Sequence, residues 1–170
     1  TNLFNEEIFV YTPKGDMKIL PKGATALDFA FEIHTDIGFH CTSILVNNKL
    51  VPMGYTLENG DRVSVNTSNH QKPSKSWLNM VITGKARSKI RSSMKEQKRT
   101  DGKIGKETLE RKLKNMKAHM EPNVEFLVKH YKQTSRIDLF YAIAQGEIEL
   151  KKLKDFDVLA GILSYKKEET

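Results

Sequence analysis

The side chains with the richest chemistry in this sequence are five histidines and a single cysteine. His34 and His40 flank Asp36, and Cys41 follows directly, which are the residue types of a zinc site or of a thiol paired with a base. No second cluster completes a zinc site at the usual ligand spacing. No third group that would orient a Cys–His pair can be identified, and a buried cysteine is commonly inert. We therefore expect neither a metal site nor a catalytic thiol.

Other catalytic patterns are also missing from the sequence. There is no Gly-rich phosphate loop followed by Lys and Ser/Thr, and no carboxylate pair in a catalytic context. We therefore expect a binding fragment that is not itself an enzyme and that needs no cofactor. No run reaches the ~18 apolar residues of a membrane span, and one cysteine allows no internal disulfide, so we expect a cytoplasmic protein. Because the sequence begins with Thr1, we expect it to be a piece of a longer protein.

The segment 36–41 offers a different kind of chemistry. Gly38 permits a tight path for the chain, which places a ring and an imidazole, Phe39 and His40, next to each other after a predicted helix. Such a pair can stack on an unpaired base and hydrogen-bond its edge or its sugar. The alternative is that Phe39 belongs to the hydrophobic core, and the residue types alone favour neither reading.

Charge is distributed unevenly along the chain. Residues 1–70 hold five Lys/Arg and eight Asp/Glu, whereas residues 72–117 hold fifteen and four. A concentrated basic stretch is typical of nucleic-acid contact, because phosphate neutralisation releases counterions. A charged helix face that is merely solvated is the alternative. The change of sign indicates two modules, a domain at 1–70 and a basic α-helical domain at 71–170.

The first module has the pattern of a small sheet holding one helix. Strands are predicted at residues 8–12 and 17–20 around a Pro-Lys-Gly-Asp turn, and later strands at 43–46, 49–51 and 62–66. Between them, residues 24–34 have helical periodicity. This order predicts an α+β, β-grasp fold.

Local signals define the ends and the interior of that helix. Thr25 is placed as its N-cap with Asp28 in the capping-box position, and Gly38 lies where the element is expected to end. The residues predicted to form the core are Phe9, Tyr11, Leu20, Phe29, Ile33, Ile44, Val46, Leu57, Val63 and Val65.

The second module is expected to be all-helical. Ser74 is the predicted N-cap of a first helix, and residues 85–99 form the next, with an interruption at 100–102. In 85–99 an apolar stripe runs beside a basic one made of Arg87, Arg91 and Lys95. Further helices are predicted at 107–120, 124–131 and 137–144, with a short one around Leu150 and Leu153.

Several motifs, read in order, resemble the TGS domain, the β-grasp module shared by threonyl-tRNA synthetases, some GTPases and RelA/SpoT proteins. The matching segments are residues 10–16, 20–30, 33–38 and 51–52, together with Tyr55, Leu57, Gly60 and Asp61. Residues 74–78, 86–91 and 140–148 resemble the helical domain that follows TGS in long RelA/SpoT-type proteins. The resemblance covers nearly the whole chain.

The resemblance implies a regulatory role in the stringent response. RelA/SpoT-type proteins make and degrade (p)ppGpp with synthetase and hydrolase domains that are absent from this sequence. In ribosome-bound long members, the TGS domain grips the CCA end of deacylated tRNA. The partners implied are deacylated tRNA, the ribosome, the protein's own catalytic domains and, as an alternative, an acyl carrier protein. The candidate RNA-binding residues are His34, Phe39, His40, Arg87, Lys89, Arg91 and Lys95.

This sequence departs from the family pattern at the expected tRNA contact. The family usually continues His-Arg-Cys where this chain has Phe39-His40-Cys41. Phe39 can stack but cannot donate a hydrogen bond, which leaves His40 as the residue that would compensate. Two other functions stay open: a module that relays signals or docks a protein without touching RNA, and an isolated enzyme, for which we expect no turnover.

Overall fold

The computed structural model describes residues 6–168, and its chain divides into two compact units, residues 1–94 and 95–170. Each unit has its own hydrophobic core. The first unit begins with the antiparallel hairpin of β1 (Glu7–Tyr11) and β2 (Met17–Pro21), as the sequence predicted. A second group of strands has the order β4-β3-β5: β3 (Cys41–Val46) pairs with both β4 (Lys49–Val51) and β5 (Val63–Thr67).

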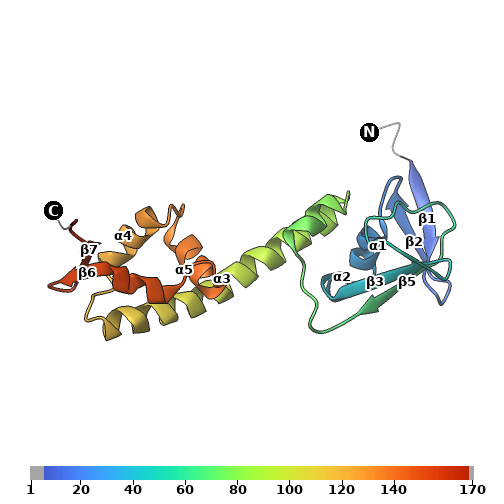
Figure 1. Ribbon diagram of the computed structural model, residues 1–170. Helices are drawn as coiled ribbons and strands as arrows, with labels where there is room; N and C mark the ends of the chain where they lie inside the picture. Colours follow the sequence, from blue (N-terminus) through green and yellow to red (C-terminus); the bar gives the residue numbers. More distant parts are fainter. Residues whose placement is uncertain (1–5, 169–170) are drawn as a thin grey trace. The chain divides into compact units, whose positions relative to one another are not determined.

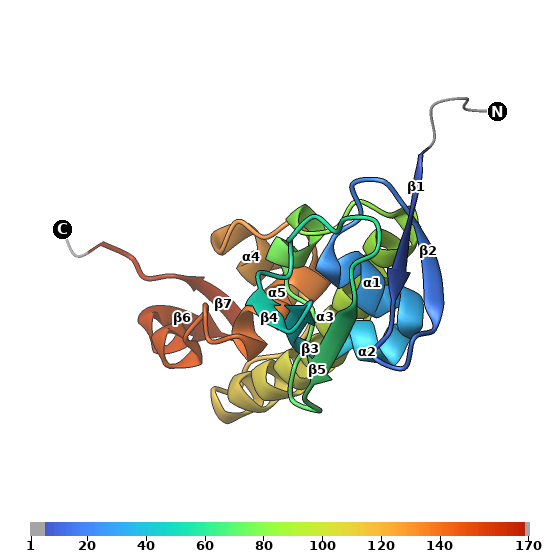
Figure 2. The same ribbon diagram turned by 90° about the vertical axis from the view of Figure 1, so that its right-hand side faces the viewer.

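A parallel bridge between Tyr11 and Arg62 joins the two groups of strands through β1 and β5. The resulting order, β2-β1-β5-β3-β4, is that of a β-grasp sheet, with α1 (Ala26–Ile33) lying against β3 and β5 (Figures 1 and 2). The β-grasp fold predicted from the sequence is therefore confirmed. So is the capping box of α1, in which the side chains of Thr25 and Asp28 and the backbone N–H groups of the same two residues bond reciprocally.

The sequence placed the wrong face of β1 in the core. Phe9 was predicted to be buried but is 38% exposed, whereas Ile8 and Val10 are buried. Because side chains alternate across a strand, choosing the neighbouring residue reverses the inward face. The strand has apolar residues at consecutive positions, so its pattern could not decide between the two faces.

The end of the predicted helix also needed correction. Residues 36–41 were expected to form a loop after Gly38 ended the helix, but α1 ends at Ile33 and a second short helix, α2 (Thr35–Phe39), follows. Gly38 lies inside α2, at a point where a Cβ would overlap the ring of Phe31. Glycine at this position therefore serves close packing rather than helix termination.

The long helix α3 (Gly84–Asn115) runs without a break through both units. The expected interruption at residues 100–102 is wrong: Gly102 is buried within the helix, and Asp101 accepts hydrogen bonds from Gln97 and Gln145. Before α3, a 3₁₀ helix, η1 (Lys75–Asn79), replaces the predicted first α-helix, and the side chain of Ser74 makes no capping hydrogen bond to it.

Residues beyond position 70 contribute to the core of the first unit. Trp77, Val81, Ala86 and Ile90 are buried in the same cluster as the β-grasp side chains. Packing therefore extends the first unit through Met94, while residue 70 as the limit of an independently folding domain stays a prediction.

The second unit is mainly helical. The predicted helices at 124–131 and 137–144 correspond to α4 (Asn123–His130) and α5 (Arg136–Ala144), and η2 (Leu150–Asp155) is a 3₁₀ helix. The chain then forms an antiparallel hairpin of β6 (Phe156–Leu159) and β7 (Ile162–Tyr165). The expectation of an all-helical region missed this hairpin.

None of the helices in residues 6–168 is both long enough and apolar enough to span a membrane.

Candidate functional site

The two histidines predicted to contact RNA lie at opposite ends of α2. His34 is its N-cap and His40 its C-cap. Six residues of helix correspond to a rise of about 9 Å between the two positions. The helix itself is held by Phe31 beneath Gly38 and by Phe39, whose ring meets that of Phe31 edge to face at 5.7 Å.

His34 presents a hydrogen-bond donor to solvent. Its Nδ1 accepts the backbone N–H of Asp36 at 3.1 Å, and its side chain is 65% exposed. A backbone N–H can only donate, so Nδ1 carries no proton and the neutral ring holds its proton on Nε2. The outward-facing atom of His34 is therefore an N–H group.

His40 has the opposite tautomer. Its Nδ1 lies 3.1 Å from the carbonyl oxygen of Gln71, which can only accept a hydrogen bond, so Nδ1 carries the proton. The neutral ring then offers Nε2 as an acceptor. Gln71 is itself held by a hydrogen bond from its amide to the Cys41 carbonyl at 3.0 Å. Sequence reasoning missed Gln71, and no pattern in the sequence signals its contact with His40.

Phe39 is half-buried and packs against the core of the first unit. The structure therefore favours the core reading of Phe39 over the stacking one, because much of its ring is already in contact with protein. Cys41 is fully buried, and desolvation raises the pKa of its thiol from 9.0 to about 11. A thiol with so high a pKa is a poor nucleophile.

The basic residues of α3 lie on two flanks of a buried stripe. At 3.6 residues per turn, Arg87 and Arg91 fall on one side of Ala86 and Ile90, and Lys89 falls on the other. Arg87 is half-buried and donates to the Val81 carbonyl at 3.2 Å, whereas Lys89 and Arg91 are exposed.

The predicted basic stripe of Arg87, Arg91 and Lys95 is thus an arrangement along one side of α3, and Lys89 is separate from it. Lys95 is exposed and is the first residue of the second unit. Helix α3 as a whole holds twelve Lys/Arg and four Asp/Glu, which gives it a net charge of +8.

A buried carboxylate joins the β-grasp helix to the start of α3. Asp28 is 2% exposed and accepts the N–H and hydroxyl of Thr25. It also accepts the N–H of Ile82 at 3.0 Å, and the N–H and hydroxyl of Thr83 at 3.1 and 2.7 Å. The Thr83 hydroxyl in turn accepts the N–H of Ala86, which caps α3. A threonine just before a helical pattern is a standard N-cap signal, so Thr83 could have been found from the sequence.

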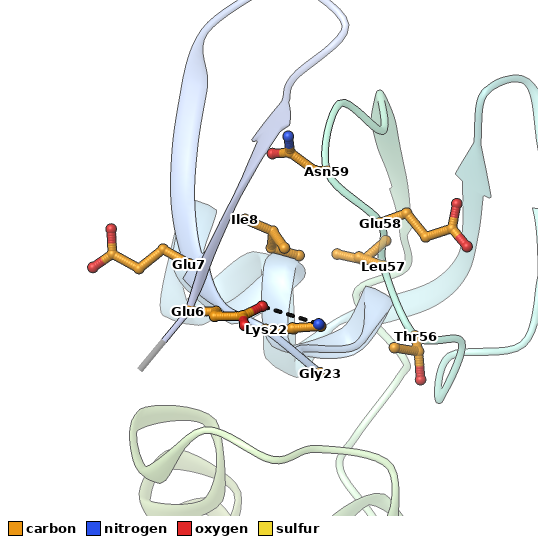
Figure 3. A pocket seen from close by; sticks show the side chains of 9 residues that line it. All are labelled: Glu6, Glu7, Ile8, Lys22, Gly23, Thr56, Leu57, Glu58 and Asn59. Carbon is orange, nitrogen blue, oxygen red and sulfur yellow. Dashed lines mark hydrogen bonds and ion pairs between the residues drawn. The ribbon is translucent and has the colours of Figure 1, made fainter. Parts of the chain in front are cut away.

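A pocket of about 440 Å³ with acidic residues in its lining lies beside the start of β1 in the first unit (Figure 3). Ile8 and Leu57 face each other across it, and Lys22 is paired with Glu6 at 2.9 Å. Glu7 and Glu58 add further negative charge at its edge. A pocket with three glutamates and one paired lysine repels phosphate, so it does not extend a nucleic-acid site.

The described residues 6–168 contain no group of three or more His, Cys, Asp or Glu side chains arranged to hold a metal ion.

Comparison with known proteins shows which proteins the chain is similar to. Residues 8–67 match the model of the TGS domain. Over 99% of its length the chain is 36% identical to a guanosine-3′,5′-bis(diphosphate) 3′-pyrophosphohydrolase of Aquifex aeolicus, and it covers 24% of that protein. The chain is a homologue of RelA/SpoT-type proteins.

Two further relatives are GTP pyrophosphokinases. One, from Escherichia coli, is 32% identical over 92% of the chain, which covers 22% of that protein. The other, from Myxococcus xanthus, is 48% identical over 66% of the chain, which covers 15% of it. The chain therefore spans a quarter or less of the length of these RelA/SpoT-type relatives.

Proposed function

We propose that this chain is the regulatory segment of a cytoplasmic RelA/SpoT-type enzyme that makes or degrades (p)ppGpp, and that it senses deacylated tRNA on the ribosome through the tRNA's CCA end. The catalytic domains of that enzyme are not among these 170 residues. The observation that carries the proposal is that Nδ1 of each histidine is engaged by a backbone group at one end of α2, from which we infer the two tautomers. The N–H of His34 can donate to a phosphate or ribose oxygen, and Nε2 of His40 can accept from a ribose hydroxyl.

The role expected of Phe39 changes in this proposal. Because its ring packs on Phe31, Phe39 anchors α2 to the core of the first unit. The polar contacts with the RNA end then come from the two histidines. The role that the family pattern gives to a histidine at position 39 thus falls to His40, and His34, which belongs to the matching segment 33–38, adds a second imidazole.

The exposed basic residues of α3 supply the electrostatic part of binding. Arg91, Lys89 and Lys95 are exposed, and none of them takes part in an ion pair among the described residues. Contacts of this kind position a phosphate backbone without reading its sequence. Arg87 contributes less, since its guanidinium is already bonded to Val81.

The proposal is tested by titrating labelled deacylated tRNA with the full 170-residue chain at several salt concentrations. We expect affinity to fall as salt rises. The slope of the logarithm of the association constant against the logarithm of salt concentration should be about −0.9 for each duplex phosphate contacted and about −0.7 for each single-strand phosphate. Arg91→Glu should weaken binding and reduce that slope, whereas Lys152→Glu, an exposed lysine on η2, should do neither. Affinity that is independent of salt and of Arg91 would refute the RNA contact.

A second candidate function is docking of a protein such as an acyl carrier protein without RNA contact. Phe39 does not discriminate between the two functions, because its half-buried ring stacks on a base in neither of them. Capture of purified acyl carrier protein by the chain in the presence of RNase, together with no binding of tRNA, would support this function over the first.

A further inference from the structure

A groove runs between α3 and α5 in the second unit, apart from the residues considered so far. Its volume is about 220 Å³. The residues that line it are Arg99, Gly102, Lys103 and Lys106 of α3 and Ile137 and Phe140 of α5.

Two glycines of α3 create this groove. Gly105 lies so close to the Phe140 backbone carbonyl that a Cβ would overlap it, so the two helices touch there. At Gly102 the missing side chain leaves space, because a Cβ there would meet only Ile137 Cγ2, at 3.8 Å. Glycine costs a helix interior about 1 kcal/mol relative to alanine, and Gly105 has a packing reason for that cost. Gly102 has none.

The rim of the groove is basic. Arg99, Lys103 and Lys106 are spaced by four and three residues, which places them on one face of α3. All three are exposed, and Lys103 and Lys106 form no ion pair among the described residues. Arg99 pairs only with Glu96, at 2.8 Å, and both side chains are more than 60% exposed, so that pair is readily exchanged for another acid.

The floor of the groove is aliphatic. Ile137 is 52% exposed beside these cations, whereas Phe140 is only 7% exposed. Base stacking needs an exposed ring, which the floor lacks. Pockets that enclose a small-molecule ligand run from roughly 300 to 1,000 Å³, and this groove is smaller. It fits one aliphatic side chain.

We propose that this groove docks an acidic amphipathic helix of a protein partner. One leucine-sized side chain of that helix fills the space over Gly102 and contacts Ile137. Carboxylates one turn away on the same helix pair with Lys103 and Lys106. This is the helix-in-groove mode of peptide recognition, with the charged rim fixing the orientation of the ligand.

The probe for this proposal is a fluorescein-labelled helical peptide of about 15 residues, near the length at which isolated helices form. Its leucines lie four apart among glutamates, and a second peptide of the same composition has its leucines on opposite faces. Anisotropy titrations use the full chain. The patterned peptide should bind roughly tenfold more tightly than the other.

Two variants and their controls complete the experiment. Gly102→Leu fills the groove and should weaken the patterned peptide by roughly tenfold, whereas Gly84→Leu, at a position with no neighbouring atom within 4 Å, should not. The pair Lys103→Glu and Lys106→Glu should weaken it similarly, unlike Lys152→Glu with Lys154→Glu. Circular dichroism checks that each variant is folded. If Gly102→Leu is not folded, the charge variants test the proposal.

Four results would overturn the proposal. The two peptides could bind equally, or groove filling and charge reversal could leave binding unchanged. A single-stranded RNA oligonucleotide in place of the peptide could bind in a manner that Gly102→Leu abolishes, which would make the groove an RNA site. Self-association of the chain in sedimentation, lost in Gly102→Leu, would instead make the occupant a second copy.

Discussion

Replacing Asp28 by asparagine should destabilise the first unit by about 2 to 4 kcal/mol. The buried carboxylate accepts four hydrogen bonds from Thr25, Ile82 and Thr83, and a fifth from the Thr25 hydroxyl, whose proton is shared with the Met80 carbonyl. Asparagine has one acceptor oxygen, so its NH₂ group must face donors on one side, and two or three of them lose their acceptor. Each buried donor left unsatisfied costs about 1 to 3 kcal/mol, which partial rearrangement of the hydroxyls reduces.

The assay is urea unfolding followed by tryptophan fluorescence. Trp77 is the single tryptophan and is buried in the core of the first unit, so its signal reports that unit. The control is Asp36→Asn, at an exposed position in the first turn of α2, which should cost no more than about 1 kcal/mol. If Asp28→Asn changed the free energy of unfolding by no more than the control, the carboxylate would not hold α3 to the β-grasp domain.

Three further predictions concern other parts of the chain. Cys41 should react with Ellman's reagent only as the first unit unfolds, because it is buried and burial raises its pKa to about 11; fast reaction of the native chain would contradict this. Gly105→Ala should destabilise the second unit by about 1 to 3 kcal/mol in thermal melts, since the methyl group of the alanine overlaps the Phe140 carbonyl; an unchanged melt would contradict the close packing. The hydrogen bond from Lys98 lowers the pKa of Asp138, so this carboxylate stabilises the fold above about pH 4 and the contribution is lost as pH falls through the lowered value. Melting temperatures of Asp138→Asn and the unaltered chain should therefore converge in acid, and a constant difference would refute the assignment.

Much of the first unit could be predicted because its signals are local. The capping box of Thr25 and Asp28 and the hairpin turns depend on neighbouring residues, and both are present as expected. The inward face of β1 could not be predicted, since apolar side chains occupy both faces of that strand. The continuity of α3 across residues 100–102 was missed for another reason: Asp101 accepts a hydrogen bond from Gln145, and Gly105 packs against the backbone of Phe140, contacts that no local pattern reveals.

In the candidate site, too, residue types could be predicted locally whereas contacts between distant residues could not. His34, His40 and the exposed basic residues could be selected by type; the structure shows His34 exposed and His40 half-buried. The contacts of His40 with Gln71 and of Asp28 with Thr83 join residues 31 and 55 positions apart. Such pairings arise from tertiary packing and could not be read from spacing along the chain.

Recognition of the tRNA 3′ end is tested most directly by comparing the affinity of the chain for intact deacylated tRNA with its affinity for the same tRNA trimmed of its CCA end. We expect the intact tRNA to bind at least roughly tenfold more tightly, and His34→Ala to remove this preference while leaving the affinity for trimmed tRNA unchanged. Equal affinity of the unaltered chain for the two tRNAs would contradict the account.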